Sequence, residues 1–240
     1  MTRITVVNPN TSAELTAAIT TAAQAVAPLG VEIHGAQPDV GVPSVESHTE
    51  EQFAAVGVLE LVRRHDAVTD AFVVACFGDT GVAAAREVAS GPVIGMTEAA
   101  LQTACLVAER FAVITLPPRT AAHSHRVVHA LGLGHRCVVS AVDTGVADLL
   151  DGSTHLLETF ATAAWAAREQ DGAEAIVLGC AGLADLVEPL SETVGMPVID
   201  GVAAAVGLAS SLLAMGVGTS RAQTFAPMTV PALRLAEGIA

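Results

Sequence analysis

The sequence contains no lysine and no tyrosine, and all 11 of its basic residues are arginine. Without a lysine amine the chain cannot hold pyridoxal phosphate or a carbonyl substrate as a Schiff base. Phosphate-binding loops that depend on lysine are excluded for the same reason. Any chemistry must therefore come from cysteine, histidine, carboxylates, hydroxyls and the backbone.

Positive charge is scarce as well, since the formal net charge is −14. Nucleic acids and anionic membranes are bound by basic patches, so neither is expected as a partner. The segment from Met1 to Val7 lacks the charged head and long apolar stretch of a signal peptide. The longest uncharged run, residues 201–220, is interrupted by glycine and serine, which favours a buried helix over a membrane span. We therefore expect a cytoplasmic protein.

A short apolar pattern that ends on a cysteine occurs twice, nearly half a chain length apart. The two copies are Phe72-Val73-Val74-Ala75-Cys76 and Ile176-Val177-Leu178-Gly179-Cys180. Each is followed by a small-residue turn and then, after almost the same interval, by an apolar run that begins at Pro92 or Pro197. Earlier segments match too, namely Arg3-Ile4-Thr5-Val6-Val7 and Arg110-Phe111-Ala112-Val113-Ile114. The sequence therefore predicts two like halves that each offer one thiol.

Short apolar runs alternate with helical segments throughout the chain, which is typical of parallel sheets covered by helices. We predict an α/β fold with two pseudo-symmetric lobes, each a small parallel sheet flanked by helices, and an active site in the cleft between them. The first lobe is expected to span residues 1–96 and the second residues 97–215. The segment 216–240 has no counterpart in the other half and is expected to pack back on the first lobe.

The two repeated cysteines, Cys76 and Cys180, fall at strand ends, where parallel sheets bind their ligands. Each is expected at a helix N-terminus, where its pKa should fall below the usual value of about 8.5. One thiolate can remove a proton from a carbon centre while one thiol delivers a proton to the opposite face, without a cofactor. Backbone N–H groups at Phe77-Gly78 and Ala181-Gly182 could stabilise the resulting enolate. Cys105 and Cys137 fit the pattern of buried hydrophobic residues instead.

The histidines and the acidic residues after the cysteines give weaker signals. His125 and His129 share a helix face, but no glutamate completes an H-E-x-x-H arrangement, so no metal ligands are expected. Asp79 and Asp185 follow the two cysteines. Either carboxylate could orient a thiol or simply complement the start of a helix.

Several motifs spread over nearly the whole chain are shared with one family of enzymes. They are Asn8-Pro9-Asn10-Thr11-Ser12, Cys76-Phe77-Gly78-Asp79, Arg86-Glu87, Pro92-Val93-Ile94-Gly95, Glu98-Ala99-Ala100, Arg110-Phe111, Leu178-Gly179-Cys180-Ala181-Gly182 and Pro197-Val198-Ile199-Asp200-Gly201. In these motifs the chain resembles the Asp/Glu/hydantoin racemase superfamily, and within it the hydantoin racemase and allantoin racemase branch.

The resemblance implies an isomerase with two pseudo-symmetric lobes and no cofactor. It implies racemisation of 5-substituted hydantoins or allantoin by Cys76 and Cys180, so the substrate would be a small cyclic ureide. A homo-oligomer is expected. The substrate-binding residues predicted on this basis are Asn8, Val45, Phe77, Gly78, Asp79, Thr80, Thr115, Ala181 and Gly182.

The chain departs from the family pattern at three places. Thr80 stands where the family usually has proline, Val42 replaces a proline often found before Ser44, and Leu116-Pro117-Pro118 alters a stretch usually richer in threonine and arginine. The last two are expected to line the pocket, so they bear on the substrate more than on the reaction. The open alternatives are an Asp/Glu racemase or maleate-isomerase-like enzyme and a non-catalytic small-molecule binding protein. A decarboxylase of the malonate type needs only one cysteine, so the second thiol counts against it.

Overall fold

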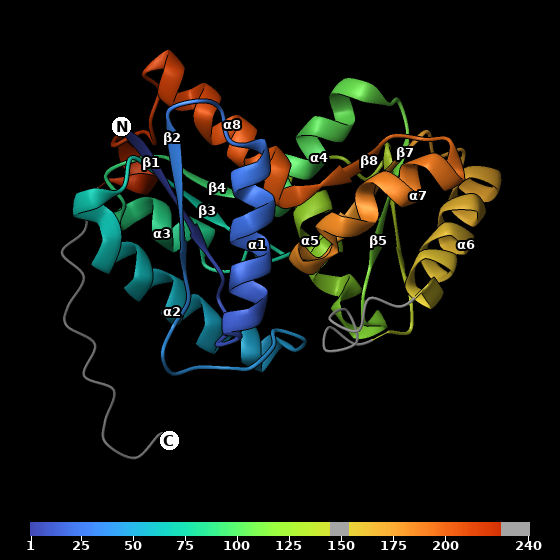
Figure 1. Cartoon of the computed structure of the whole chain (residues 1–240), viewed down its shortest axis with the longest axis horizontal. Coiled ribbons are helices and arrows are strands. Elements are labelled where there is room, and N and C mark those ends of the chain that lie inside the picture. The colour runs from blue at the N-terminus through green and yellow to red at the C-terminus, as the bar shows by residue number, and fades with distance from the viewer. Residues whose placement is uncertain (145–153, 227–240) are drawn as a thin grey trace.

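The computed structural model describes residues 1–144 and 154–226 and contains two four-stranded parallel sheets in this part of the chain (Figure 1). The first sheet has the order β2-β1-β3-β4, and the second has the order β6-β5-β7-β8. The strands are β1 (Thr2–Val7), β2 (Val31–Ala36), β3 (Ala71–Val74), β4 (Val93–Gly95), β5 (Phe111–Thr115), β6 (Cys137–Ala141), β7 (Ala175–Gly179) and β8 (Val198–Asp200). The identical order in both sheets confirms the predicted α/β fold with two like halves.

The register of the strands brings the two cysteine turns to equivalent positions. In the first sheet Val7 pairs with Val74, and in the second Thr115 pairs with Gly179. Because the strands are parallel, the residues that follow them gather at one edge of each sheet. Cys76 therefore follows the inner strand β3 in the first sheet, as Cys180 follows β7 in the second.

Each sheet is covered by two helices on each face. In the first sheet α1 (Ala13–Val26) and α8 (Gly201–Met215) pack on one face, and α2 (His48–His65) and α3 (Val82–Val88) pack on the other. In the second sheet α4 (Met96–Val107) and α5 (Ala121–Ala130) cover one face, and α6 (Thr154–Asp171) and α7 (Val187–Val194) cover the other. The 3-10 turns are η1 (Asp66–Val68), η2 (Pro118–Thr120), η4 (Ala181–Leu186) and η5 (Gln223–Phe225).

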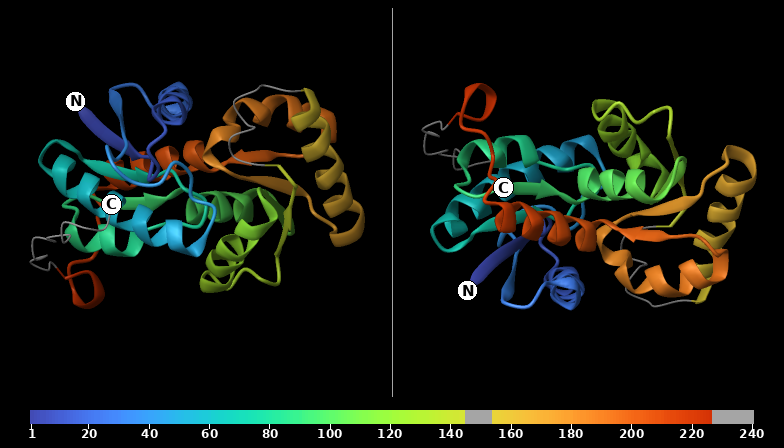
Figure 2. Two further views of the ribbon diagram at one scale, coloured as in Figure 1. Left: turned by 90° about the horizontal axis from the view of Figure 1, so that it is seen from below. Right: turned by 90° about the horizontal axis from the view of Figure 1, so that it is seen from above.

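The last helix of each half packs on the sheet of the other half. Helix α4 follows β4 of the first sheet but contributes Leu101 and Ala104 to the core of the second. Helix α8 follows β8 of the second sheet but contributes Val202 and Val206 to the core of the first. It starts at the second lobe and runs along the first (Figure 2). The division at residues 96 and 97 stays a prediction, and α8, which it assigns to the second lobe, lies with the first by packing.

Local signals explain where the helices begin. Ser12 accepts a hydrogen bond from the N–H of Leu15 at 3.1 Å and so caps α1. Asp200 caps α8 in the same way, through the N–H of Ala203 at 2.7 Å. The segment after Cys180 forms the 3-10 turn η4 and then α7.

The end of the described chain returns to the first lobe. The guanidinium of Arg221 donates to the carbonyl oxygens of Arg86, at 2.9 Å, and Ala89, next to the end of α3. The predicted packing of the segment 216–240 can be followed up to residue 226, and the rest lies outside the described residues. Within the described residues no helix is both long enough and apolar enough to cross a membrane.

Candidate active site

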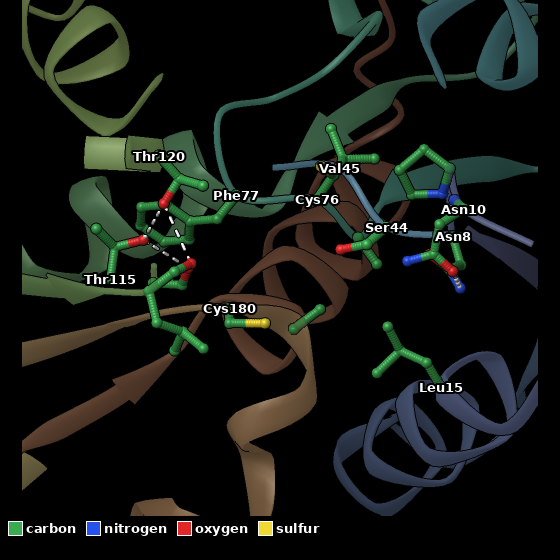
Figure 3. Close-up of a pocket in the computed structure, with 15 residues that line it drawn as sticks. Asn8, Asn10, Leu15, Ser44, Val45, Cys76, Phe77, Thr115, Thr120 and Cys180 are labelled. Atoms are coloured by element: carbon green, nitrogen blue, oxygen red, sulfur yellow. Dashed lines mark hydrogen bonds between the residues drawn. The ribbon is translucent and has the colours of Figure 1, made fainter. Parts of the chain in front are cut away.

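The ends of β1 and β3 face those of β5 and β7 across a cleft of about 480 Å³, part of it open to solvent (Figure 3). Both Cys76 and Cys180 line it, each coming from a different lobe. The other lining residues are Asn8, Pro9, Asn10, Leu15, Ser44, Val45, Ala75, Phe77, Thr115, Leu116, Thr120, Gly179 and Ala181. The structure thus brings the two repeated thiols to one site.

Cys76 is held in the protonated form by its surroundings. Burial raises the pKa of its thiol to about 12, and the negative charges of Cys180, Asp79 and Glu51 act in the same direction. The hydroxyl of Thr80 lies 3.4 Å from Sγ and opposes this shift, because a hydrogen bond to the thiolate stabilises the charged form. The expected lowering of the pKa by a helix N-terminus is wrong here, since α3 begins only at Val82.

The surroundings of Cys180 also favour the protonated thiol, but its hydrogen-bond partners differ from those of Cys76. Burial raises the pKa of this thiol to about 11, while hydrogen bonds from the N–H groups of Gly182 and Ala181 oppose the rise. Cys180 stands directly before η4, so its sulfur does meet free amide groups as expected. The expected net lowering of the pKa is nevertheless wrong, because the desolvation of a buried thiolate outweighs these hydrogen bonds.

The loop after Cys76 is fixed to the start of α4. Gly78 and Asp79 both have positive φ angles, 113° and 55°. The N–H of Gly78 donates to Oγ1 of Thr97 at 2.7 Å, and the carboxylate of Asp79 accepts from the N–H groups of Thr97 and Glu98 at 2.8 and 2.9 Å. Asp79 therefore caps α4, which was one of its two expected roles. The N–H of Gly78 is already used and is not free to stabilise an enolate.

The predicted substrate-binding residues fall into two groups. Asn8, Val45, Phe77, Thr115 and Ala181 line the cleft. Gly78, Asp79, Thr80 and Gly182 are not among the lining residues, and they contact the cysteines or fix the loop that carries Cys76. Of the departures from the family pattern, Leu116 lines the cleft and Val42 does not.

Sequence reasoning did not select Asn10, Ser44 or Thr120, which also line the cleft. Asn10 shares a turn with Asn8, and its place after a strand was a usable signal. Ser44 lies in the loop of the second departure, which was expected to line the pocket. Thr120 follows the cis peptide bond between Leu116 and Pro117, and no pattern in the sequence predicts its approach to the cleft.

The polar groups of the cleft are neutral amides and hydroxyls. The amide nitrogen of Asn8 donates to Oδ1 of Asn10 at 2.9 Å and to Oγ1 of Thr16 at 3.0 Å, so Asn8 holds the turn and orients Asn10. On the opposite wall Oγ1 of Thr115 donates to the carbonyl of Gly179 at 3.1 Å. Among the described residues that line the cleft, none has an ionised side chain at neutral pH.

Comparisons with known proteins agree with this fold. The family model of the Asp/Glu/hydantoin racemases matches residues 4–209. The hydantoin racemase of Paenarthrobacter aurescens is 38% identical, over 93% of this chain and 96% of the relative. That of Rhizobium meliloti is also 38% identical, over 98% of this chain and 97% of the relative. The chain therefore belongs to the Asp/Glu/hydantoin racemase family.

A solved structure narrows the enzyme class within this family. Allantoin racemase from Klebsiella pneumoniae superposes with a TM-score of 0.93 at 45% identity, covering 97% of this chain and 96% of that one. The chain is a racemase of the hydantoin or allantoin racemase type, which acts on a small molecule.

Proposed function

We propose that the protein racemises 5-substituted hydantoins or allantoin without a cofactor, with Cys76 and Cys180 as a paired acid and base. The observation that carries this proposal is that two thiols from equivalent strand ends line one cleft from opposite lobes. A planar ring bound between them would present one face of its stereocentre to each sulfur.

The reaction is a balanced proton exchange. The thiolate of one cysteine removes the hydrogen on the ring carbon, and the electron pair of the C–H bond moves into the adjacent carbonyl to form an enolate. The thiol of the other cysteine then donates its proton to the opposite face of the same carbon. The two sulfurs end with their protonation states exchanged, and proton exchange with solvent restores the starting state.

Because the pKa values of both thiols are raised, only a minor fraction of each cysteine is thiolate, but that thiolate is a strong base. A thiolate with a pKa near 11 or 12 is a better match for a weakly acidic carbon than one with a pKa near 8. The hydroxyl of Thr80 and the backbone N–H groups after Cys180 limit the rise in the thiol pKa values and so maintain that fraction. Catalysis should therefore gain from rising pH until the second thiol or the substrate also ionises.

The neutral lining of the cleft favours a cyclic ureide over an amino acid with a free carboxylate. A hydantoin ring offers carbonyl oxygens and N–H groups, which match the amides and hydroxyls of the cleft. Oδ1 of Asn10 accepts from Nδ2 of Asn8 and from the N–H of Ser12, whereas Nδ2 of Asn10 donates to no other described residue. We assign Nδ2 of Asn10 as a donor to the enolate oxygen.

Substitution of each cysteine tests the proposal. Cys76→Ser and Cys180→Ser should each abolish racemisation in polarimetry, whereas Cys105→Ser, outside the cleft on α4, should leave it intact. In deuterium oxide each single variant should still exchange hydrogen from one enantiomer, because the remaining thiol reaches one face. Full activity in both cleft variants would contradict the two-cysteine mechanism.

The alternatives predict different outcomes with the same protein. A clear preference for aspartate or glutamate over hydantoins and allantoin would favour an amino-acid racemase. Ligand-induced thermal stabilisation without any change in optical rotation would indicate a binding protein. A homo-oligomer remains part of the proposal, and light scattering after size exclusion would measure it directly.

A further inference from the structure

A cluster of ionisable side chains joins the two lobes at one side of the cleft. His48 and Glu51 come from the first turn of α2 in the first lobe, and His123 and Arg126 come from α5 in the second. The two histidine side chains are in direct contact, with Nε2 of His123 3.3 Å from Nδ1 of His48. The cluster is not part of the cleft lining and has no role in the proposed reaction.

Three atoms of this cluster form a nearly equilateral triangle. Oε2 of Glu51 lies 3.8 Å from Nδ1 of His48 and 3.7 Å from Nε2 of His123, and the two nitrogens are 3.3 Å apart. The centre of such a triangle is about 2.1 Å from each corner, which matches zinc–nitrogen and zinc–oxygen bond lengths of about 2.0–2.2 Å. The three atoms are therefore spaced as three ligands of one ion would be.

The burial of the cluster suits a metal site with one open position. Glu51 and His123 are 6% and 3% exposed, whereas the side chain of His48 is 75% exposed and leaves a path for the ion. The ion pair with Arg126 stabilises the buried carboxylate of Glu51. Three protein ligands and one water would complete a tetrahedral zinc ion.

The positive charge of Arg126 disfavours a cation at this site, but the position of its guanidinium leaves room for an ion. Its Nη1 donates to Oε2 of Glu51 at 3.1 Å, and its Nη2 donates to Oε1. A carboxylate has about four lone-pair positions, so Oε2 can accept the hydrogen bond from Arg126 and coordinate an ion at the same time. In this arrangement Arg126 orients the ligating carboxylate from behind, as outer-shell partners do in metal sites.

We propose that His48, Glu51 and His123 bind a divalent transition-metal ion of the zinc class and clamp α2 of one lobe to α5 of the other. The ion would replace the hydrogen bond between the two rings, and one ring would move its proton to its other nitrogen. The clamp adjoins the catalytic loop, since Nη2 of Arg126 also donates to the carbonyl of Gly78 at 3.2 Å. The expectation of no metal ligands rested on the local spacing of His125 and His129, and this site joins residues from separate helices.

Cobalt(II) titration of the chelator-treated full chain tests the site, because cobalt spectra distinguish nitrogen and oxygen ligands from thiolates. We expect one ion per chain, visible bands without a thiolate-to-cobalt charge-transfer band, and an increase in melting temperature with zinc. His48→Ala should weaken binding by at least about 100-fold, since changes to outer-shell partners alone typically cost 10- to 100-fold. His123→Ala should do the same.

The matched control is the double variant His125→Ala/His129→Ala, which removes the exposed histidine pair from α5 and should bind as the wild type does. Because the side chain of His48 is exposed, the His48→Ala variant should fold normally, and circular dichroism would check this. No binding to the wild type, equal binding by His48→Ala, loss of binding in the double variant, or a thiolate charge-transfer band would each overturn the proposal.

Discussion

Replacing Thr80 by valine should weaken the base at Cys76 without changing the shape of the cleft. The hydroxyl of Thr80 lies 3.4 Å from Sγ of Cys76, and the side chain is only 2% exposed. A hydrogen bond to a charged group contributes about 1.5–3 kcal/mol. Since 1.36 kcal/mol corresponds to a tenfold change in a protonation equilibrium, its loss should raise the pKa of Cys76 further and shift that equilibrium towards the neutral thiol by roughly 10- to 100-fold.

The loss of catalytic activity should be equally large for the racemisation of either enantiomer. At fixed pH below the pKa, the thiolate fraction of Cys76 falls by roughly 10- to 100-fold. Two enantiomers have equal free energy in solution, so kcat/KM for one must equal kcat/KM for the other in any variant. Thr80→Val should therefore lower both values by the same factor, even though Cys76 is the base in only one direction.

Polarimetry with each pure enantiomer at several pH values would measure this effect. Alkylation of Cys76 by iodoacetamide, followed by mass spectrometry, would report the thiolate directly and should slow by a similar factor. Thr80→Ser keeps the hydroxyl and should retain most of the activity. If Thr80→Val reacts and alkylates within twofold of the wild type, the hydroxyl does not stabilise the thiolate. If Thr80→Ser is as impaired as Thr80→Val, the methyl group rather than the hydrogen bond is responsible.

Three further predictions follow from the same structure. Enzymatic racemisation should rise steeply between pH 7 and pH 10, because the thiol pKa values are raised to about 12 and 11; a plateau below pH 8, after subtraction of the uncatalysed rate, would contradict this. Gly179→Ala should destabilise the fold by about 2–3 kcal/mol in urea denaturation, because the new Cβ would lie 2.7 Å from Cα of Thr115 and 2.9 Å from the carbonyl of Ile114, whereas Gly134→Ala, with nothing within 4 Å, should be neutral. Burial, with the charge of Glu98, raises the pKa of Asp79 from 3.8 to about 6, so this group stabilises the fold fully below pH 3.8 and loses that contribution as pH rises to 6. Asp79→Asn should remove this pH dependence, up to about 3 kcal/mol across that window, and an unchanged slope would refute the assignment.

The repeated strand-to-cysteine pattern was sufficient to predict the fold class, because each copy placed equivalent elements in the same order. The pattern could not show which sheet α8 covers, since a helix that is apolar all round can pack on either. It also could not give the thiol pKa values, because desolvation of Cys76 depends on how the lobes close over it. The bond from Gly78 to Thr97 and the contact of His48 with His123 join distant parts of the chain. Local spacing carries no information about such contacts.

The exchange of α4 and α8 between the lobes has a consequence for folding during synthesis. The second sheet is covered by helices that are made before it or within its own half, so its core can close soon after residue 200 leaves the ribosome. The first sheet is made earlier, yet Ile4, Val73 and Met96 belong to a core that also requires Val202 and Val206 of α8. Until that helix emerges, one face of the nascent first lobe stays partly uncovered. The half of the protein that is synthesised first should therefore be the half that folds last.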